Sequence, residues 1–251
     1  MTIDSVDNKK IKNIRKLNQK KYRDETNEFL VEGIHLVKEA YKEGLLKEVV
    51  LEENEEIDFK VDTTYVTYNV IKSISSLDTP YKIIGVCKKK EEKEINGNVL
   101  VLDGLQDPGN LGTIIRSAVA FNVDTIILSK DTVDLYNPKV VRSTQGMNFH
   151  INIIRRDLEH EINALKEKGY TVYSTDVING KNIKNVKVNG KYAIIMGNEG
   201  NGIRPAIEAF VNEKLYIPNY PEGRDTSESL NVAIATAVVC AEFRRRQGNP
   251  A

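Results

Sequence analysis

The sequence of 251 residues predicts an α/β protein whose larger, C-terminal part is built on a mainly parallel sheet. Helix-like and strand-like runs alternate from residue 98 onward, as they do in consecutive βαβ units. The run NVLVLDGL is apolar almost throughout, which is typical of a buried parallel strand. Gly/Asn-rich loops follow three of the strand-like runs, and such loops line up backbone amides along one edge of a parallel sheet.

The first third of the sequence predicts a smaller α/β unit. Ile11, Ile14, Leu17 and Tyr22 recur at near-helical spacing and predict an amphipathic helix. Strands are predicted at EFLVEG, KEVVLEE, TTYVTY and KIIGVCK, and helices at HLVKEAYKEG and NVIKSISSLD. The charged stretch KKKEEKEINGN follows and has no apolar face to bury, which is typical of a linker. We therefore expect two domains, at residues 1–90 and 98–251.

The second part of the chain supplies the remaining elements. Strands are predicted at NVLVLDGL, DTIILSK, HINIIR, YTVYSTD, KYAIIMG and EKLYIP. Helices are predicted at GTIIRSAVAFN, NPKVVRSTQ, LEHEINALKEKG, RPAIEAF and SLNVAIATAVVCAEFRRR. Composition and periodicity alone specify no closer fold than this.

The formal net charge of zero argues against an RNA-binding protein, because phosphate contacts normally leave a basic excess. The charge is unevenly distributed, however, and no acid interrupts the basic residues of the first predicted helix. A stripe of one sign on a helix predicts a contact with RNA phosphate, and a solvated face is the alternative. The stripe comprises Lys9, Lys10, Lys12, Arg15, Lys16, Lys20, Lys21 and Arg23.

Several classes of protein are disfavoured. No run approaches the roughly 20 apolar residues that span a bilayer, and the polar start MTIDSVDNKK lacks a signal region, so we expect a cytoplasmic protein without a membrane partner. Cys87 and Cys240 lack metal-ligand spacing and are interpreted as small buried hydrophobes. The three histidines are scattered, and no metal site is expected.

The first candidate motif is NxGxxxR, with Asn110, Gly112 and Arg116. Pro108 and Gly109 form a turn, and Asn110 can cap the helix that follows. A helix cap with an exposed arginine is the alternative interpretation. A guanidinium stays protonated at neutral pH, so Arg116 suits a fixed donor that clamps phosphate or stabilises developing negative charge.

The second motif is the loop GNEGNGI. Its glycines allow the backbone to approach a ligand closely and to adopt positive φ. The loop fits neither GxGxxG nor the GK[ST] ending of a phosphate loop, which disfavours dinucleotide and ATP binding. The loop provides Gly197, Asn198, Glu199, Gly200, Asn201 and Gly202.

The last motif begins at Ile217 and Pro218 and resumes at Ser229, Leu230 and Asn231. Ser229 and Asn231 precede a predicted helix, where free backbone N–H groups and short polar side chains can orient a ligand. Helix capping alone is the alternative.

These segments, in this order, resemble the three motifs of the SpoU/TrmH family of RNA ribose 2'-O-methyltransferases, over about residues 98 to 246. The resemblance implies a Rossmann-like catalytic domain with a trefoil knot, in which the C-terminal chain is threaded through an earlier loop, and S-adenosyl-L-methionine as cofactor. The N-terminal unit is similar to the ribosomal-protein-like α/β domain of family members that modify ribosomal RNA. RNA is therefore the expected partner, with ribosomal RNA favoured over transfer RNA.

The resemblance also implies roles for individual residues. The segment NPKVVRSTQG matches a family segment that borders the active site, where Arg142 contacts RNA phosphate or caps a helix. The loop between Pro218 and Ser229, with Glu222, Arg224 and Asp225, is longer than the usual family spacing. The implied catalytic residues are Asn110, Arg116, Glu199, Ser229 and Asn231, and the implied cofactor-binding residues are Gly197, Asn198, Gly200, Gly202, Ile217, Pro218, Ser229 and Leu230.

Other readings of the same pattern are a transfer-RNA 2'-O-methyltransferase, a non-catalytic RNA-binding or ribosome-assembly factor with this fold, and a small-molecule methyltransferase. The retained motif residues argue against the non-catalytic factor, and the basic helix argues against a small-molecule substrate. We also expect a homodimer, because knotted family members pair through the catalytic domain. The helix from Ser229 to Arg246 has small or apolar residues on more of its circumference than one buried stripe requires.

Overall fold

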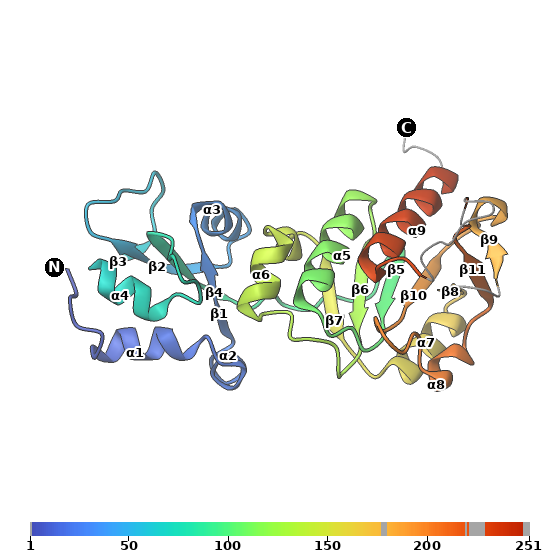
Figure 1. Cartoon of the computed structure of the whole chain (residues 1–251), viewed down its shortest axis with the longest axis horizontal. Coiled ribbons are helices and arrows are strands. Elements are labelled where there is room, and N and C mark those ends of the chain that lie inside the picture. The colour runs from blue at the N-terminus through green and yellow to red at the C-terminus, as the bar shows by residue number, and fades with distance from the viewer. Residues whose placement is uncertain (1, 177–179, 219, 221–228, 248–251) are drawn as a thin grey trace. The chain divides into compact units, whose positions relative to one another are not determined.

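The computed structural model describes residues 2–176, 180–218, 220 and 229–247. The chain forms two compact units, and Figure 1 gives the order of their elements. Unit 1 comprises Met1–Glu91 and Asp134–His150, and unit 2 comprises Glu92–Val133 and Ile151–Ala251. The sequence-based division into 1–90 and 98–251 therefore differs from these units in the segment 134–150, which packs with the N-terminal part of the chain.

Unit 1 is built on a four-stranded sheet with the order β1-β4-β2-β3. Its strands are β1 (Glu28–Glu32), β2 (Leu46–Glu52), β3 (Asp62–Val66) and β4 (Ile83–Lys88). β4 pairs antiparallel with both β1 and β2, whereas β2 and β3 are parallel. All four strands were predicted from their apolar runs.

Two layers of helices cover this sheet. On one face, α1 (Lys9–Lys16) and α4 (Tyr68–Ile74) contribute Ile11, Ile14 and Ile71 to a core with the sheet. On the other face lies α3 (Ile34–Lys42). The predicted first helix is in fact two helices, because a turn at Leu17–Gln19 separates α1 from α2 (Lys20–Thr26).

The segment 134–150 completes the second core of unit 1. It contains α6 (Pro138–Thr144), which Asn137 caps through Lys139 N at 2.9 Å, and a short 3-10 helix, η1 (Met147–Phe149). Val141 and Phe149 are buried with residues of α3 and the unit 1 sheet. In chain order this segment lies between two strands of unit 2, so local sequence patterns give no sign of where it packs.

Unit 2 is built on a seven-stranded sheet with the order β7-β6-β5-β10-β8-β11-β9, and every strand pair in it is parallel. The predicted, mainly parallel sheet is thus confirmed. The strands are β5 (Val99–Leu102), β6 (Thr125–Leu128), β7 (Asn152–Arg155), β8 (Thr171–Thr175), β9 (Lys181–Asn182), β10 (Tyr192–Met196) and β11 (Glu213–Tyr216). Only the two-residue β9 lacked a signal in the sequence, because so short a strand has no periodicity.

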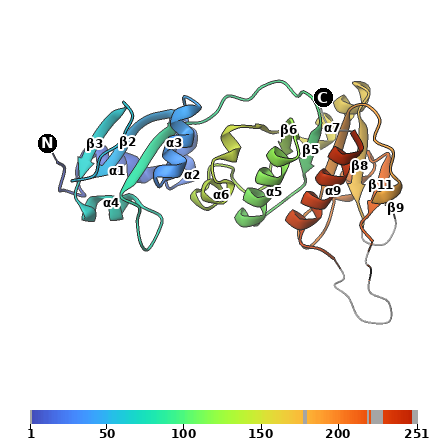
Figure 2. The same cartoon turned by 90° about the horizontal axis from the view of Figure 1, so that it is seen from above.

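The helices of unit 2 lie on both faces of its sheet (Figure 2). On one face, α7 (Leu158–Glu167) and α8 (Pro205–Glu208) pack on alternate strand residues such as Val101 and Ile195. On the other, α5 (Pro108–Ala120) and α9 (Val232–Gln247) lie against each other, and Phe243 of α9 contacts the rings of Tyr173 and Tyr192. This alternation of side chains is what a parallel sheet covered on both faces requires.

Two further expectations concern the whole chain. Within the described ranges, no helix is long and apolar enough to cross a membrane. The knotted threading implied by the resemblance stays a prediction.

Candidate functional site

The loop after β10 is a tight turn braced by its own asparagine. Asn198 N donates to Gly202 O at 2.9 Å, and Gly202 N returns a bond to Asn198 O at 3.0 Å. The Asn198 side-chain oxygen accepts from the backbone N–H groups of Gly200 and Asn201, at 2.9 and 3.1 Å. Its amide nitrogen donates to Gly104 O at 2.7 Å, which ties the loop to the end of β5. The Asn198 side chain therefore determines the shape of the loop.

Two glycines of this loop are required by its shape. A Cβ on Gly197 would lie 2.3 Å from the carbonyl carbon of Gly202, which no side chain can tolerate. Gly202 has φ +68°, a conformation that residues with a side chain adopt only at a cost. A Cβ on Gly200, in contrast, would meet only the Asn198 side chain at 3.6 Å. The loop thus leaves room at position 200 and none at position 197.

The Glu199 carboxylate joins this loop to the start of α5. It accepts from Gln106 N at 3.3 Å, from Asp107 N at 3.1 Å and from the Asn110 side-chain nitrogen at 3.1 Å. Burial raises the pKa of Glu199, but these hydrogen bonds together outweigh burial, so that its net pKa lies below the usual range. Glu199 is therefore ionised at neutral pH and acts as an acceptor only.

Asn110 links Glu199 to the start of α9. Its side-chain oxygen accepts from the Asn231 side-chain nitrogen at 3.0 Å. The Asn231 oxygen in turn accepts from Ala233 N at 2.9 Å and from Ile234 N at 3.4 Å, and so caps α9. Because each amide donates on one side and accepts on the other, the carboxylate of Glu199 and the N-terminus of α9 fix the orientation of both. The chain Glu199–Asn110–Asn231 links all three sequence motifs.

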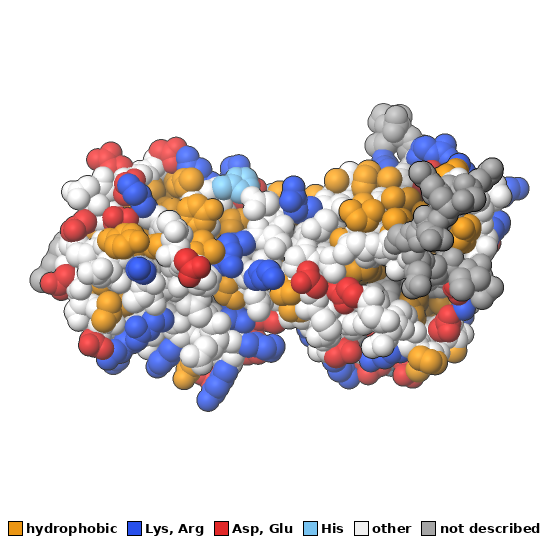
Figure 3. Space-filling view, viewed as in Figure 1, with side chains coloured by type: hydrophobic (Ala, Val, Ile, Leu, Met, Phe, Trp, Pro, Cys, Tyr) orange, Lys and Arg blue, Asp and Glu red, His pale blue; other side chains and the backbone are white. Residues whose placement is uncertain are grey.

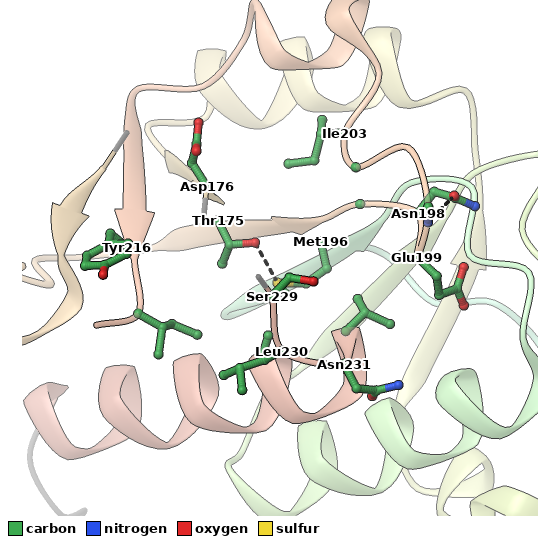
Figure 4. Close-up of a pocket in the computed structure, with 16 residues that line it drawn as sticks. Thr175, Asp176, Met196, Asn198, Glu199, Ile203, Tyr216, Ser229, Leu230 and Asn231 are labelled. Atoms are coloured by element: carbon green, nitrogen blue, oxygen red, sulfur yellow. Dashed lines mark hydrogen bonds between the residues drawn. The ribbon is translucent and has the colours of Figure 1, made fainter. Parts of the chain in front are cut away.

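A cavity of about 400 Å³ lies beside this network, at the carboxyl ends of β8, β10 and β11 (Figure 4). Met196, Ile203 and Leu230 give it apolar surface, and Glu199 and Asn231 lie at one end, while Asp176 and Tyr216 lie toward the other. Ser229 points toward the middle of the space. The cavity is lined by Thr175, Asp176, Met196, Gly197, Asn198, Glu199, Gly200, Gly202, Ile203, Tyr216, Ile217, Ser229, Leu230, Asn231, Val232 and Ala235.

Most of the catalytic and cofactor-binding residues expected from the sequence meet at this cavity. Every expected cofactor-binding residue lines it except Pro218, which follows Ile217 but is not part of the lining. Among the expected catalytic residues, Glu199, Ser229 and Asn231 line the cavity and Asn110 bonds to two of them. Arg116 is exposed on α5 and is absent from the lining.

Sequence reasoning missed the residues at the ends of β5 and β8. Asp103 is buried directly after β5 and pairs with Arg204, which follows the glycine-rich loop. Thr175 and Asp176, at the end of β8, line the cavity with Met196. The signal that could have found them is a polar residue directly after an apolar strand, at the sheet edge where ligands bind.

Only some residues of the expected RNA-binding stripe line one surface groove, and several of its lysines are paired with acids. Lys9, Lys12, Arg15 and Lys16 line one groove on unit 1 together with Tyr22, and blue side chains gather over α1 and α2 in Figure 3. Lys10 pairs with Glu48, Lys12 with Asp7, Lys20 with Asp24 and Lys21 with Glu25. In the described part of the chain, no acid lies within ion-pair distance of Lys9, Arg15 or Lys16.

The expectation that Arg23 contacts RNA is wrong. The side chain is only 3% exposed, donates to Leu17 O at 2.8 Å and pairs with Asp134 at 2.6 Å. Burial and this pairing hold it inside unit 1, where it ties α2 to the start of the segment 134–150.

Arg142 also has a structural partner that the sequence did not reveal. It donates to Ser76 Oγ at 2.6 Å and lies 3.5 Å from the buried carboxylate of Glu32. The helix cap considered for this residue is therefore not what the structure shows. The loop residues Glu222, Arg224 and Asp225 lie outside the described residues. Among those that are described, no cluster of His, Cys, Asp and Glu could hold a metal ion.

Comparison with known proteins gives two family matches. A model described as the SpoU rRNA Methylase family matches residues 97–241, and a model of the MRM3-like substrate binding domain matches residues 8–85. The chain is 39% identical over 248 residues to the 23S rRNA (guanosine(2553)-2'-O)-methyltransferase RlmP of Bacillus subtilis, across 96% of this chain and 98% of that protein.

Solved structures show the same similarity. An rRNA methyltransferase from Sinorhizobium meliloti, crystallised with bound AdoMet, has a TM-score of 0.83 and 30% sequence identity, over 98% of this chain and 97% of that one. A crystal structure of an RNA 2'-O ribose methyltransferase has a TM-score of 0.84 and 26% identity, over 98% and 99% of the two chains.

Proposed function

Because the chain belongs to the SpoU rRNA methylase family, we propose that it transfers a methyl group from S-adenosylmethionine to a guanosine ribose 2'-hydroxyl of 23S ribosomal RNA. The observation that carries this proposal is the hydrogen-bonded chain Glu199–Asn110–Asn231 at one end of the cavity. The guanosine and the 23S RNA come from the relative RlmP, with which this chain shares nearly its full length.

The cavity fits S-adenosylmethionine. Its volume of about 400 Å³ lies in the range of roughly 300–1,000 Å³ that is typical of small-molecule sites. Gly197 lets the loop backbone fold tightly against Gly202, and Met196, Ile217 and Leu230 offer the apolar surface that an adenine ring needs. When bound, the cofactor supplies a methyl group activated by its positive sulfur.

The residues of this chain would orient the two reactants and stabilise charge. Glu199 and Asn231 fix the glycine-rich loop and the start of α9 relative to α5, which holds the walls of the cavity in place before the reactants bind. The role of Arg116 would be to bind RNA phosphate and to stabilise negative charge on the ribose oxygen.

Arg116 leads to the proposal of a homodimer. Its side chain is exposed and outside the cavity lining, whereas the α5 and α9 face beside it carries apolar side chains. Leu230, Ile234 and Val238 are 43%, 52% and 38% exposed, and hydrophobic side chains gather over this region in Figure 3. A two-fold contact through these helices would cover the apolar face and bring Arg116 of one subunit to the cavity of the other.

Unit 1 is the proposed RNA-binding part. It contains the stretch matched to a substrate-binding domain, and α1 carries the basic groove residues Lys9, Lys12, Arg15 and Lys16. Such a groove would follow the phosphate backbone and contribute affinity without reading sequence. The cytoplasmic location also stays a prediction.

The test is an incubation of the purified protein with methyl-labelled S-adenosylmethionine and, separately, 23S rRNA, 16S rRNA and transfer RNA. Methylation of a 2'-hydroxyl blocks alkaline cleavage at that nucleotide, so label in alkali-stable dinucleotides from 23S rRNA is the expected result. Label in transfer RNA alone would support the transfer-RNA alternative. Tight cofactor binding without transfer to any RNA would support a non-catalytic factor.

A further inference from the structure

Asp103 is a buried carboxylate whose two oxygens are both bound by one residue. Its side chain is 0% exposed, lies directly after β5, and accepts from Arg204 N at 2.9 Å and from Arg204 Nε at 2.7 Å. Arg204 Nη2 also contacts this carboxylate, at 2.5 Å from Asp103 Oδ1. Asp103 therefore holds both the backbone and the side chain of Arg204, which itself is half exposed.

The segment 103–107 binds the glycine-rich loop near its start and the residue Arg204 just after it. Asp103 binds Arg204 after the loop, Gly104 O accepts from Asn198 near its start, and the N–H groups of Gln106 and Asp107 bind Glu199. The loop is thereby clamped on both sides of the glycines. Neither Asp103 nor Arg204 is part of the cavity lining, so any effect of this pair on a ligand passes through the loop.

The energetics of buried ion pairs argue that this pair does more than add stability. Removing the Asp103 carboxylate from water is costly, and its half-exposed partner Arg204 gains little from the pairing in return. What a forked guanidinium and a carboxylate provide is a fixed relative orientation. Hydrogen bonding to Asp103 raises the pKa of Arg204, so the guanidinium keeps its charge in this arrangement.

We propose that Asp103 and Arg204 are a positioning pair, which fixes the loop 197–202 in the conformation that binds S-adenosylmethionine. The proposal rests on the cofactor named under the proposed function. Arg204 lies two residues after Gly202, so the pair holds the backbone close to the point where an added Cβ on Gly197 would collide with Gly202.

The test compares Asp103→Asn with Asp134→Asn by calorimetry with S-adenosylmethionine. Asparagine at 103 presents an amide N–H₂ to the donors of Arg204, and we expect at least a tenfold weaker affinity. Asp134 pairs with Arg23 at 2.6 Å in unit 1, so Asp134→Asn removes a comparable pair away from the loop. It should lower the melting temperature while keeping the affinity within twofold of wild type.

Arg204→Lys keeps the charge and the backbone N–H and removes only the two-pronged guanidinium contact with Asp103. This second variant keeps the test decisive if Asp103→Asn fails to fold. We expect a higher KM for the cofactor, an unchanged KM for RNA and a kcat close to that of the wild-type protein. Wild-type affinity in both folded variants would overturn the proposal. A wild-type protein that binds the cofactor but methylates no RNA would contradict the proposed function alone and leave the positioning pair standing.

Discussion

At the residue scale, the site depends on which atoms can only accept and which can only donate. The Glu199 carboxylate faces three hydrogen-bond donors. Because it can only accept, the amides of Asn110 and Asn231 have one orientation each. The pattern GNEGNGI suggested a ligand loop, yet only the folded chain shows that Glu199 binds the start of α5. The partner lies 89 residues away from it in sequence.

Glu199→Gln tests this arrangement. The new amide N–H₂ would face a donor, and an unsatisfied polar group of this kind costs about 1–3 kcal/mol. We expect kcat to fall on the order of ten- to hundredfold, since each 1.4 kcal/mol is about a factor of ten. Single-turnover methylation measures it, with Glu213→Gln, whose partner is Lys181, as the control. An unchanged rate in Glu199→Gln would remove the network from the mechanism.

The two glycines 197 and 200 form a matched pair for cofactor binding. Gly197→Ala forces a Cβ to within 2.3 Å of backbone, and the loop must move, whereas Gly200→Ala meets one side-chain oxygen at 3.6 Å. We expect Gly197→Ala to weaken S-adenosylmethionine binding by more than tenfold and Gly200→Ala to change it less than threefold. Equal affinities of the two variants, measured by calorimetry, would contradict a backbone cradle at Gly197.

At the scale of single elements, the sequence predicted well wherever periodicity and burial agree. The strands β5, β6 and β10 are neighbours in the interior of the parallel sheet, and their runs are largely apolar. The break between α1 and α2 could not be predicted, because the apolar spacing of Ile11, Ile14 and Leu17 continues to the turn itself. Arg23 was predicted to be one more exposed cation of the stripe, because the residue type alone does not show that its side chain is buried.

The outward face of α1 should provide much of the RNA affinity. Replacing Lys9, Lys12 and Lys16 by Gln removes three groove cations, and we expect weaker 23S rRNA binding. The slope of log affinity against log salt is negative, and its magnitude should decrease by roughly two to three. The control replaces Lys38, Lys42 and Lys82, which are paired with acids elsewhere on unit 1. If both triple variants bind RNA equally in filter-binding titrations, α1 is a solvated face.

The apolar face of α9 should form the dimer contact. Ile234→Arg places a charge at the proposed two-fold interface, and we expect sedimentation at micromolar concentration to shift from twice the 28.3 kDa chain mass to a single chain, with loss of activity. Ile34 is similarly exposed, at 46%, but lies in unit 1, so Ile34→Arg should remain a dimer. A wild-type protein that sediments as one chain and is fully active would refute the proposal.

At the scale of the whole molecule, the chain passes between its two units three times, because the segment 134–150 leaves the catalytic sheet after β6 and returns before β7. The sequence predicted the passage near residue 91 from its charged, apolar-poor composition. The two others could not be predicted, since α6 is an ordinary helix whose partners, Phe29 and Val31 among them, lie more than a hundred positions earlier. Interactions over such sequence distances determine the site and the units alike.

We propose that this protein methylates one ribose of 23S ribosomal RNA. Mass-spectrometric mapping of 2'-O-methyl groups on unmodified 23S rRNA, after incubation with the wild-type protein or Arg116→Ala and S-adenosylmethionine, tests it most directly. We expect one new 2'-O-methylguanosine with the wild-type protein and a yield lowered on the order of a hundredfold with the variant. Methylation of a base, methylation of transfer RNA only, or equal yields from the two proteins would contradict it.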